Sequence, residues 1–346
     1  MKITRLFFVA LASSILLNSC SDDDGNSPNI PLGAYDEGVL IVNEGNASAG
    51  TVSFLDDETD LVSQDIFSAE NPGEGLGGFV QSIFFDDDKA FIISNGSNKI
   101  TVVNRYTFKL ITKIETGFNV PRYGVVENGK AYVTNLASFT NLTDDFVSVI
   151  NLNTMLVEST IPLNAIAERI VEENGKLYIS NGSYGVGNSI TVVNAATNAI
   201  ETTIDVGISP TSMEEEDGFL YVLCGNNVAN SKLVKINLAN NQIISELVLM
   251  GLINAQNLSI EDDKMYFTVN SAVYAQNISA TTASSTPLFT SGATTLYGFT
   301  VEDDKIYVSD AKDYASNGEV FIYNTSGVLQ KQFNVGLIPN GFYFND

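Results

Sequence analysis

A repeated unit constrains the fold of this chain more than any other feature. A short turn of Asp, Asn or Gly is followed by a strand-like run with an aromatic residue, and this unit recurs about every 41–46 residues. This period is typical of a four-stranded propeller blade, whose copies stack around an axis because none buries its faces alone. The residue that follows each turn marks the copies: Lys89, Lys130, Lys176, Phe219, Lys264 and Lys305.

A second element keeps the same phase and gives the number of blades. It is a β-branched strand that ends in Asn or Asp, as in Ile100–Asn104, and it occurs seven times. We interpret the final polar residue as closing the hairpin between the two outer strands, in preference to forming a binding face. The seven closing residues are Asp56, Asn104, Asn151, Asn194, Asn237, Asn277 and Asn324.

The two ends of the chain support closure into a ring. The last segment, from Pro339 to Asp346, supplies only an inner strand, whereas the first unit begins near Gly38 without one. Pairing these ends would remove the exposed edges of an open sheet. The sequence therefore predicts an all-β, seven-bladed β-propeller over residues 36–346, closed by pairing of the C-terminal strand with the N-terminal blade.

The first residues have the pattern of an export signal. Lys2 and Arg5 precede an apolar run, Leu6 to Leu17, that is too short to span a bilayer, which predicts a signal peptide over residues 1–19. The run ends in Leu-Asn-Ser-Cys, which resembles a bacterial lipobox and makes Cys20 the acylated, palmitate-bearing lipid anchor. The alternative is an ordinary signal peptide with an incidental cysteine. With Cys20 acylated, Cys224 is the only thiol left and no intrachain disulfide forms.

An acidic run follows the cysteine. Asp22-Asp23-Asp24 and the Gly, Asn, Ser and Pro residues after it predict a flexible tether over residues 20–35. The run resembles the export signal that Bacteroidota place after a lipidated cysteine, and this resemblance implies an outer-membrane lipoprotein that faces the cell exterior. The alternative is a spacer that is merely soluble.

Composition excludes several classes of function. The chain has 41 acidic and 17 basic residues, a formal net charge of −24, so a nucleic-acid partner is disfavoured. It has no His, which removes the usual general base and the commonest metal ligand. We therefore expect no catalytic residues, no metal site and no cofactor.

The repeat resembles a known family, the YVTN-type seven-bladed propellers of bacterial and archaeal surface proteins. Residues 132–135 read Tyr-Val-Thr-Asn, the signature itself, and residues 188–200 follow the family's strand-turn pattern closely. The resemblance covers about residues 36–346. It implies the fold and says little about chemistry, because propellers host many unrelated functions.

A ring of polar residues is predicted where the innermost strands begin, at the mouth of the central channel. Counting eight residues back from each turn marker gives a polar residue every time, which an apolar core position would not do, and polar groups around one axis suit a polar ligand. The alternative is a ring that binds only water. The ring residues are Gln81, Arg122, Glu168, Thr211, Gln256, Tyr297 and Asn340, the last placed by alignment of Pro339-Asn340 with Pro121-Arg122.

Loops on the same face carry large aromatic residues that would line a broad pocket. The segments Leu136–Asp145 and Gly182–Gly187 are longer than a hairpin needs, and long loops on a rigid scaffold often serve recognition. A single exposed aromatic is more often a local packing element. The candidates are Phe118, Tyr123, Phe139, Tyr184 and Tyr314.

Acidic segments and the second cysteine are given structural interpretations. Residues 86–88, 214–217, 261–263 and 302–304 lack the Asp-x-Asp-x-Asp-Gly spacing of a calcium loop, and we expect them to be solvated inner turns on the rim opposite the ring. Cys224 has no basic or thiol neighbour in sequence and is expected to be buried and unreactive.

Three functions are compatible with these features. The leading hypothesis is a non-catalytic surface lipoprotein that captures a small-molecule ligand at the channel mouth. Some Bacteroidota surface propellers bind corrinoids such as vitamin B12 (cobalamin) and pass them to an outer-membrane transporter, and the resemblance implies a corrinoid ligand and such a partner. The alternatives are a structural or adhesive protein that contacts protein or glycan, and a metal-dependent enzyme of the lactonase type.

Overall fold

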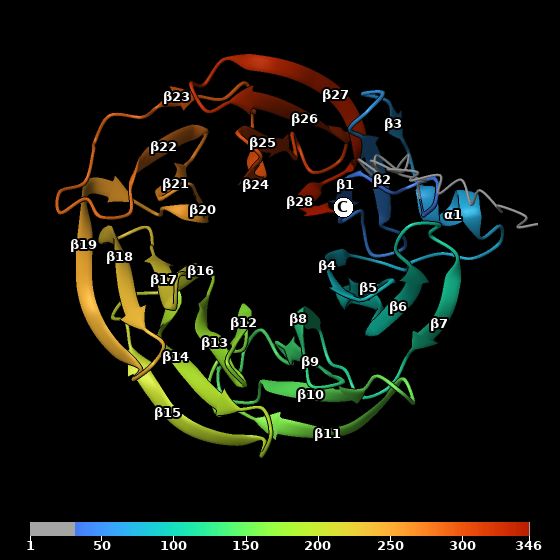
Figure 1. Ribbon diagram of the computed structural model, residues 1–346, viewed down its shortest axis with the longest axis horizontal. Helices are drawn as coiled ribbons and strands as arrows, with labels where there is room; N and C mark the ends of the chain where they lie inside the picture. The colour runs from blue at the N-terminus through green and yellow to red at the C-terminus, as the bar shows by residue number, and fades with distance from the viewer. Residues whose placement is uncertain (1–31, 346) are drawn as a thin grey trace, which may run out of the picture. The chain divides into compact units, whose positions relative to one another are not determined.

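The fold is a ring of seven four-stranded antiparallel sheets. The computed structural model describes residues 32–345, so the predicted signal peptide, Cys20 and the acidic run lie outside the described residues. In the described part the sheets are arranged around a common axis, with one strand of each sheet innermost (Figure 1). The predicted all-β, seven-bladed propeller is confirmed.

We number the blades one to seven in chain order and give their strands from the channel outward. Blade one comprises β28 (Pro339–Phe344), β1 (Gly38–Asn43), β2 (Thr51–Asp56) and β3 (Val62–Ser63). Blade two comprises β4 (Val80–Asp86), β5 (Lys89–Ser94), β6 (Lys99–Asn104) and β7 (Leu110–Ile114). Blade three comprises β8 (Pro121–Glu127), β9 (Lys130–Asn135), β10 (Phe146–Asn151) and β11 (Leu156–Pro162). Blades four and five are β12 (Ile170–Glu173), β13 (Lys176–Ser183), β14 (Val186–Asn194) and β15 (Ala199–Asp205); and β16 (Pro210–Glu216), β17 (Phe219–Cys224), β18 (Asn230–Asn237) and β19 (Gln242–Ile253). Blades six and seven are β20 (Gln256–Glu261), β21 (Lys264–Val269), β22 (Ala272–Asn277) and β23 (Phe289–Thr290); and β24 (Leu296–Glu302), β25 (Lys305–Asp310), β26 (Asn317–Asn324) and β27 (Leu329–Leu337).

The repeat markers coincide with strand ends. In blades two to seven the second strand begins at the residue that follows the inner turn, and in every blade the third strand ends at the predicted closing Asn or Asp. The side chain of each closing residue accepts a hydrogen bond from a backbone N–H of the following turn. Examples are Thr107 N to Asn104 Oδ1 at 2.9 Å and Val328 N to Asn324 Oδ1 at 2.9 Å. The structural interpretation of these residues is therefore confirmed.

Aromatic residues of the second strands join neighbouring blades. They stand two positions after the marker and are buried. The Tyr132 hydroxyl of blade three donates to the Ala195 carbonyl of blade four at 2.7 Å, and the Tyr178 hydroxyl of blade four donates to Asn241 Oδ1 of blade five at 2.9 Å. A buried hydroxyl with such a partner adds packing area without an unpaired polar group.

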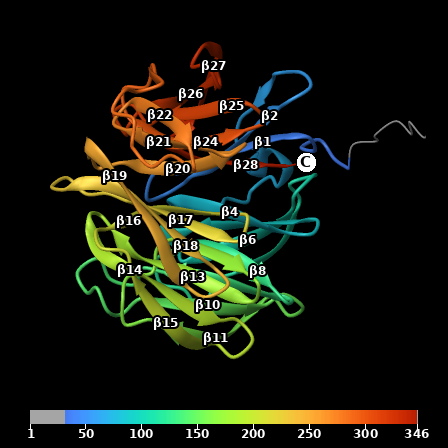
Figure 2. The ribbon, with the colours of Figure 1, turned by 60° about the vertical axis from the view of Figure 1, so that its left-hand side comes forward.

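The C-terminal strand closes the ring. β28 pairs antiparallel with β1, Leu40 opposite Tyr343 and Ile41 opposite Phe342, and both views place it beside β1 (Figures 1 and 2). Buried Asn345 continues the connection, because its Nδ2 donates to the Arg105 carbonyl of blade two at 2.9 Å and also to the Tyr35 carbonyl. Tyr35, which the sequence assigns to the end of the tether, is thus packed into the propeller.

Helical structure is minor in residues 32–345. It comprises α1 (Ile66–Glu70) and the 3₁₀ turn η1 (Asn95–Ser97). Within these residues no helix has the length and apolar character needed to cross a bilayer.

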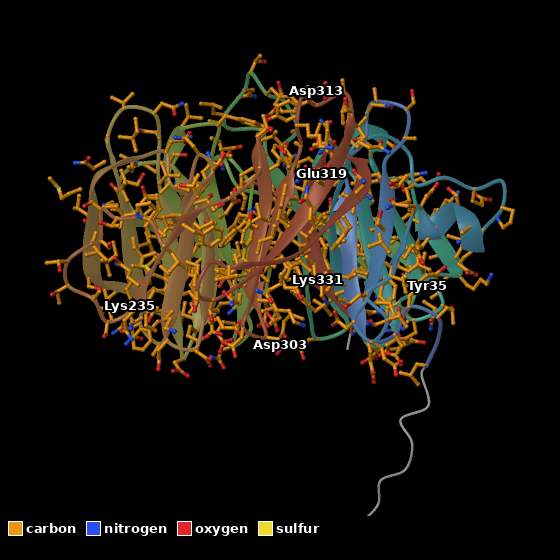
Figure 3. All side chains as sticks on the ribbon, turned by 90° about the horizontal axis from the view of Figure 1, so that it is seen from above. Tyr35, Lys235, Asp303, Asp313, Glu319 and Lys331 are labelled. Carbon is orange, nitrogen blue, oxygen red and sulfur yellow. The ribbon has the colours of Figure 1, made fainter. Side chains whose placement is uncertain are left out.

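The molecule has two rims between which the strands run. We call the rim that carries the loops between second and third strands, including Asp313, the mouth rim. The rim that carries the inner hairpin turns, including Asp303, is the turn rim, and Figure 3 shows the two residues on opposite sides. Tyr35 lies toward the turn rim in the same view.

Candidate functional site

The predicted ring residues lie where the inner strands begin, at the mouth rim. Gln81, Arg122, Thr211, Tyr297 and Asn340 are each the second residue of an inner strand, Gln256 is the first residue of β20, and Glu168 precedes β12 by two residues. Those five second residues also occupy β-bulges. In β4, for example, Val80 pairs with Ser94 and Ser82 with Ile93, which leaves Gln81 out of the ladder. A bulge redirects a side chain, and this gives the polar residues their common placement.

Arg122 and Glu168 form a buried ion pair within the ring. Arg122 Nη2 lies 2.6 Å from Glu168 Oε1 and Nε lies 3.0 Å from Oε2, and each side chain is about one-tenth exposed. Arg122 Nη1 also donates to Gln81 Oε1, which accepts from Asn95 Nδ2 at 2.8 Å. The cation and the anion therefore satisfy each other, and the Arg122 guanidinium is also bonded to blade two through Gln81. The sequence alone suggested two separate charged contacts for a ligand.

The other ring residues are bonded more loosely. Thr211 Oγ1 lies 3.1 and 3.2 Å from two backbone carbonyl oxygens, and exposed Gln256 donates to Asn254 Oδ1 at 3.1 Å. The Tyr297 hydroxyl donates to Glu44 Oε2 at 3.0 Å. Asn340 Nδ2 donates to two carbonyls, but its Oδ1 is buried and finds no donor among the described residues.

A cavity of about 190 Å³ occupies the channel and touches every blade. Tyr123 is one of the residues that line this cavity. The sequence placed Tyr123 on a loop, but it belongs to β8, and the bulge there turns it inward. The Arg169 guanidinium, also in the channel wall, stands over the Tyr123 ring at 4.0 Å. The channel therefore combines amide, phenol and guanidinium groups.

Glu214 is a functional candidate that the sequence interpretation misplaced. It was assigned to an acidic turn, but β16 continues to Glu216, so only Asp217 and Gly218 form the turn and Glu214 lines the channel. Its Oε2 accepts from Ile260 N at 2.6 Å. Burial raises the pKa of Glu214 to about 8, against the opposing effects of that bond and the Arg169 charge.

The other predicted loop aromatics comprise one exposed pair, one exposed tyrosine that contacts the ring residue Tyr297, and the half-buried Phe118. Phe139 and Tyr184 lie 6.2 Å apart, and Tyr314 meets Tyr297 edge-on at 5.7 Å. Phe118 packs instead against the hydrophobic core of blades two and three. The prediction of a long loop at 182–187 is wrong, because β13 and β14 extend into it and leave a two-residue turn, Tyr184-Gly185, with positive φ at both positions.

The positions of Asp303 and Cys224 agree with the structural interpretations given to them. Asp303 lies on the turn rim, away from the ring (Figure 3). Within residues 32–345, no three Asp, Glu or Cys side chains gather in a way that could hold a metal ion. Cys224 ends β17, and burial raises its pKa to about 12, so the thiol is unreactive at neutral pH.

The channel position of Glu214 is only weakly indicated by the sequence. Glu214 stands three residues after the ring position, where the other inner strands carry no acid. A single acidic residue at this repeat position was therefore the available indication of a channel carboxylate. Two more glutamates follow Glu214, so the whole segment has the appearance of one acidic turn.

Comparisons with known proteins support the fold and one family. A family model described as a domain of unknown function, DUF5074, matches residues 37–337. No curated protein matches the sequence.

Solved structures with the same fold are distant in sequence. The computationally designed Ika8 protein superposes with a TM-score of 0.60 at 11% identity, over 91% of this chain and 92% of that one. Hydrazine synthase of Kuenenia stuttgartiensis gives 0.60 at 14%, over 78% and 92%, and BamB of Moraxella catarrhalis gives 0.55 at 14%, over 88% and 85%. At these identities the similarity shows the fold alone.

Proposed function

Since the chain belongs to the DUF5074 family, whose description gives no function, we propose its role from the site: a non-catalytic protein that binds a polar small molecule at the channel mouth. The observation that carries the proposal is the convergence of polar side chains from all seven blades above one cavity. Convergent polar groups in a concave site are the usual basis of ligand orientation.

The unpartnered oxygen of Asn340 supports the same proposal. A buried acceptor without a donor costs free energy, and a bound water or ligand N–H would remove that cost. Gln256 and Tyr297 are more accessible and present further amide and phenol groups to a molecule at the mouth.

The size of the cavity indicates how a corrinoid would bind. Pockets that enclose a drug-sized ligand usually measure about 300–1,000 Å³, so a channel of about 190 Å³ would not admit the macrocycle. A corrinoid would lie across the mouth, with its amide side chains toward the ring and its apolar edges near Tyr184, Tyr297 and Tyr314. We extend the proposal to transfer of such a ligand to an outer-membrane transporter.

The proposed location follows from the sequence. Lipid attachment at Cys20 and the acidic run after it would hold the propeller at the outer membrane, facing the exterior. Both features lie outside the described residues, and they enter the proposal as predictions.

Cyanocobalamin titrated into the protein, followed calorimetrically, tests the ligand. Gln256→Ala and Tyr297→Phe remove exposed polar groups at the mouth, and each should weaken binding about three- to tenfold, the effect of one neutral hydrogen bond. Asp303→Ala on the turn rim is the control and should bind like the wild type. Equal affinities in all four proteins would show that cyanocobalamin binds elsewhere than at the ring. Absence of binding would favour the adhesive alternative.

A further inference from the structure

A second cavity lies on the mouth rim between blades three and four. It measures about 250 Å³ and shares no lining residue with the channel cavity. The loop between β9 and β10 forms one side and the β13–β14 hairpin the other. Its apolar walls come from Leu136, Phe139, Leu142, Ile166, Tyr184 and Val186.

Exposed aromatic rings border this cavity. Phe139 is 64% exposed and Tyr184 is 74% exposed, with their ring centroids 6.2 Å apart. Leu142 and Val186 are exposed as well. Four large apolar side chains exposed together around a hollow are more than the scattered surface residues of a monomer, and they indicate a binding site.

A buried carboxylate also lines the cavity. Asp145 is 1% exposed, and its Oδ2 accepts from Ala167 N at 2.8 Å. Its Oδ1 is buried and has no hydrogen-bond donor among residues 32–345. Burial raises the pKa of Asp145 to about 7, and the charges of Asp144 and Glu168 and hydrogen bonding of the protonated carboxyl to the Asp144 side chain act in the same direction. The lack of a donor is costly for the protein alone, and a ligand could supply that donor.

We propose that this cavity binds a ligand with a protonated amine on an aromatic body, the amine paired with Asp145 and the ring packed against Phe139 and Tyr184. An ammonium group would donate to the free Oδ1, and aromatic faces attract a cation as well as a ring. The net charge of −24 favours a cation over an anion at long range.

The inference does not depend on the proposed function. The amine site uses Asp145 and the apolar walls, whereas the channel site uses the ring, so either can fail while the other stands. Tyr184 is near both, because the Arg122 and Glu168 charges act on its hydroxyl. For this reason the decisive variant is placed at Asp145.

Tryptamine is a suitable probe because the chain contains no Trp. Indole fluorescence excited beyond the tyrosine absorption therefore comes from the probe alone, and its anisotropy reports binding directly. Indole-3-propionate carries the same ring with a carboxylate in place of the amine. We expect tryptamine to bind and indole-3-propionate to bind at least about tenfold more weakly.

Asp145→Asn keeps an acceptor for Ala167 N and removes the charge. It should weaken tryptamine about tenfold or more and leave the weak binding of indole-3-propionate unchanged or improved. Asp303→Asn is the control: it removes one carboxylate charge from an exposed position on the turn rim, opposite the cavity, and it should retain tryptamine binding. Tyr184→Ala, at an exposed position, should weaken both probes.

Three results would overturn the inference. These are absence of tryptamine binding to the wild type, equal affinity for the two probes, and equal losses in Asp303→Asn and Asp145→Asn. Melting temperatures of all variants separate lost binding from lost folding. If Asp145→Asn does not fold, the ratio of the two probe affinities in the wild type and in Tyr184→Ala still decides between an amine site and a merely apolar hollow.

Discussion

Arg122 of blade three and Glu168, which precedes the inner strand of blade four, face each other across a blade boundary at 2.6 Å. Both residues are buried, and Gln81 of blade two accepts from the same guanidinium. The ring is thus an internally bonded structure that ties three blades together on one side of the channel. On the opposite side it presents exposed Gln256 and Tyr297, the groups left available to a ligand.

The first prediction concerns the stability of this pair. Arg122→Ala leaves Glu168 buried without its partner and should lower the free energy of unfolding by about 3 kcal/mol. The double variant Arg122→Gln/Glu168→Gln removes both charges and should recover most of that loss. Urea unfolding monitored by circular dichroism measures all three proteins.

An exposed pair provides the control. Lys130 Nζ lies 2.6 Å from Glu158 Oε1, but both side chains are about one-third exposed. Lys130→Ala should therefore cost at most about 1 kcal/mol. A similar small cost for Arg122→Ala would show that the ring pair is as solvated as a surface pair.

The second prediction concerns ring closure. Deletion of residues 338–346 removes β28, exposes the edge of β1 and the face of blade seven, and removes Phe342, which contacts Tyr307 at 5.6 Å between centroids. The melting temperature should fall by at least about 10 °C, since several kcal/mol of burial are lost. Leu329→Ala, on the exposed outer strand β27, is the control and should shift it little. An unchanged midpoint after the deletion would show that blade one is stable without its inner strand.

The third prediction concerns location. Cys20→Ala should release the protein from membranes, because the acylated cysteine is the expected anchor. Replacement of Asp22, Asp23 and Asp24 by Ala should leave the protein membrane-bound but protected from protease added to whole cells. Continued cleavage of that variant would identify the acidic run as a spacer only.

The fold and the ring positions could be predicted from the repeat. The contacts between pairs of side chains in the channel could not. Strand ends and ring positions recur at fixed offsets from the inner turn, so one alignment locates them in every blade. Arg122 and Glu168 come from different repeats, and their contact depends on side-chain length and blade spacing, which the period does not contain. Tyr123 was misplaced for a related reason: its direction is determined by a one-residue bulge in β8.

The last prediction concerns pH and uses Glu214. Its pKa is raised from 4.5 to about 8 by burial in the channel, so the folded state keeps the proton over a range in which the unfolded chain has lost it. The stability that comes from the neutral form is complete below about pH 4.5 and is lost as the pH rises to about 8. For one proton the slope is at most about 1.4 kcal/mol per pH unit.

Glu214→Gln remains neutral at every pH and retains an acceptor for Ile260 N. Its stability relative to the wild type should therefore grow between pH 5 and pH 8 and then level off. The exposed Glu158 is the control: its hydrogen bond and ion pair with Lys130 lower its pKa, so the difference between Glu158→Gln and the wild type should not grow over this range. Unfolding free energies at pH 5, 6, 7, 8 and 9 provide the comparison. A constant difference for Glu214→Gln would mean that water solvates the Glu214 carboxylate fully, and the channel would then be a hydrated pore around that residue.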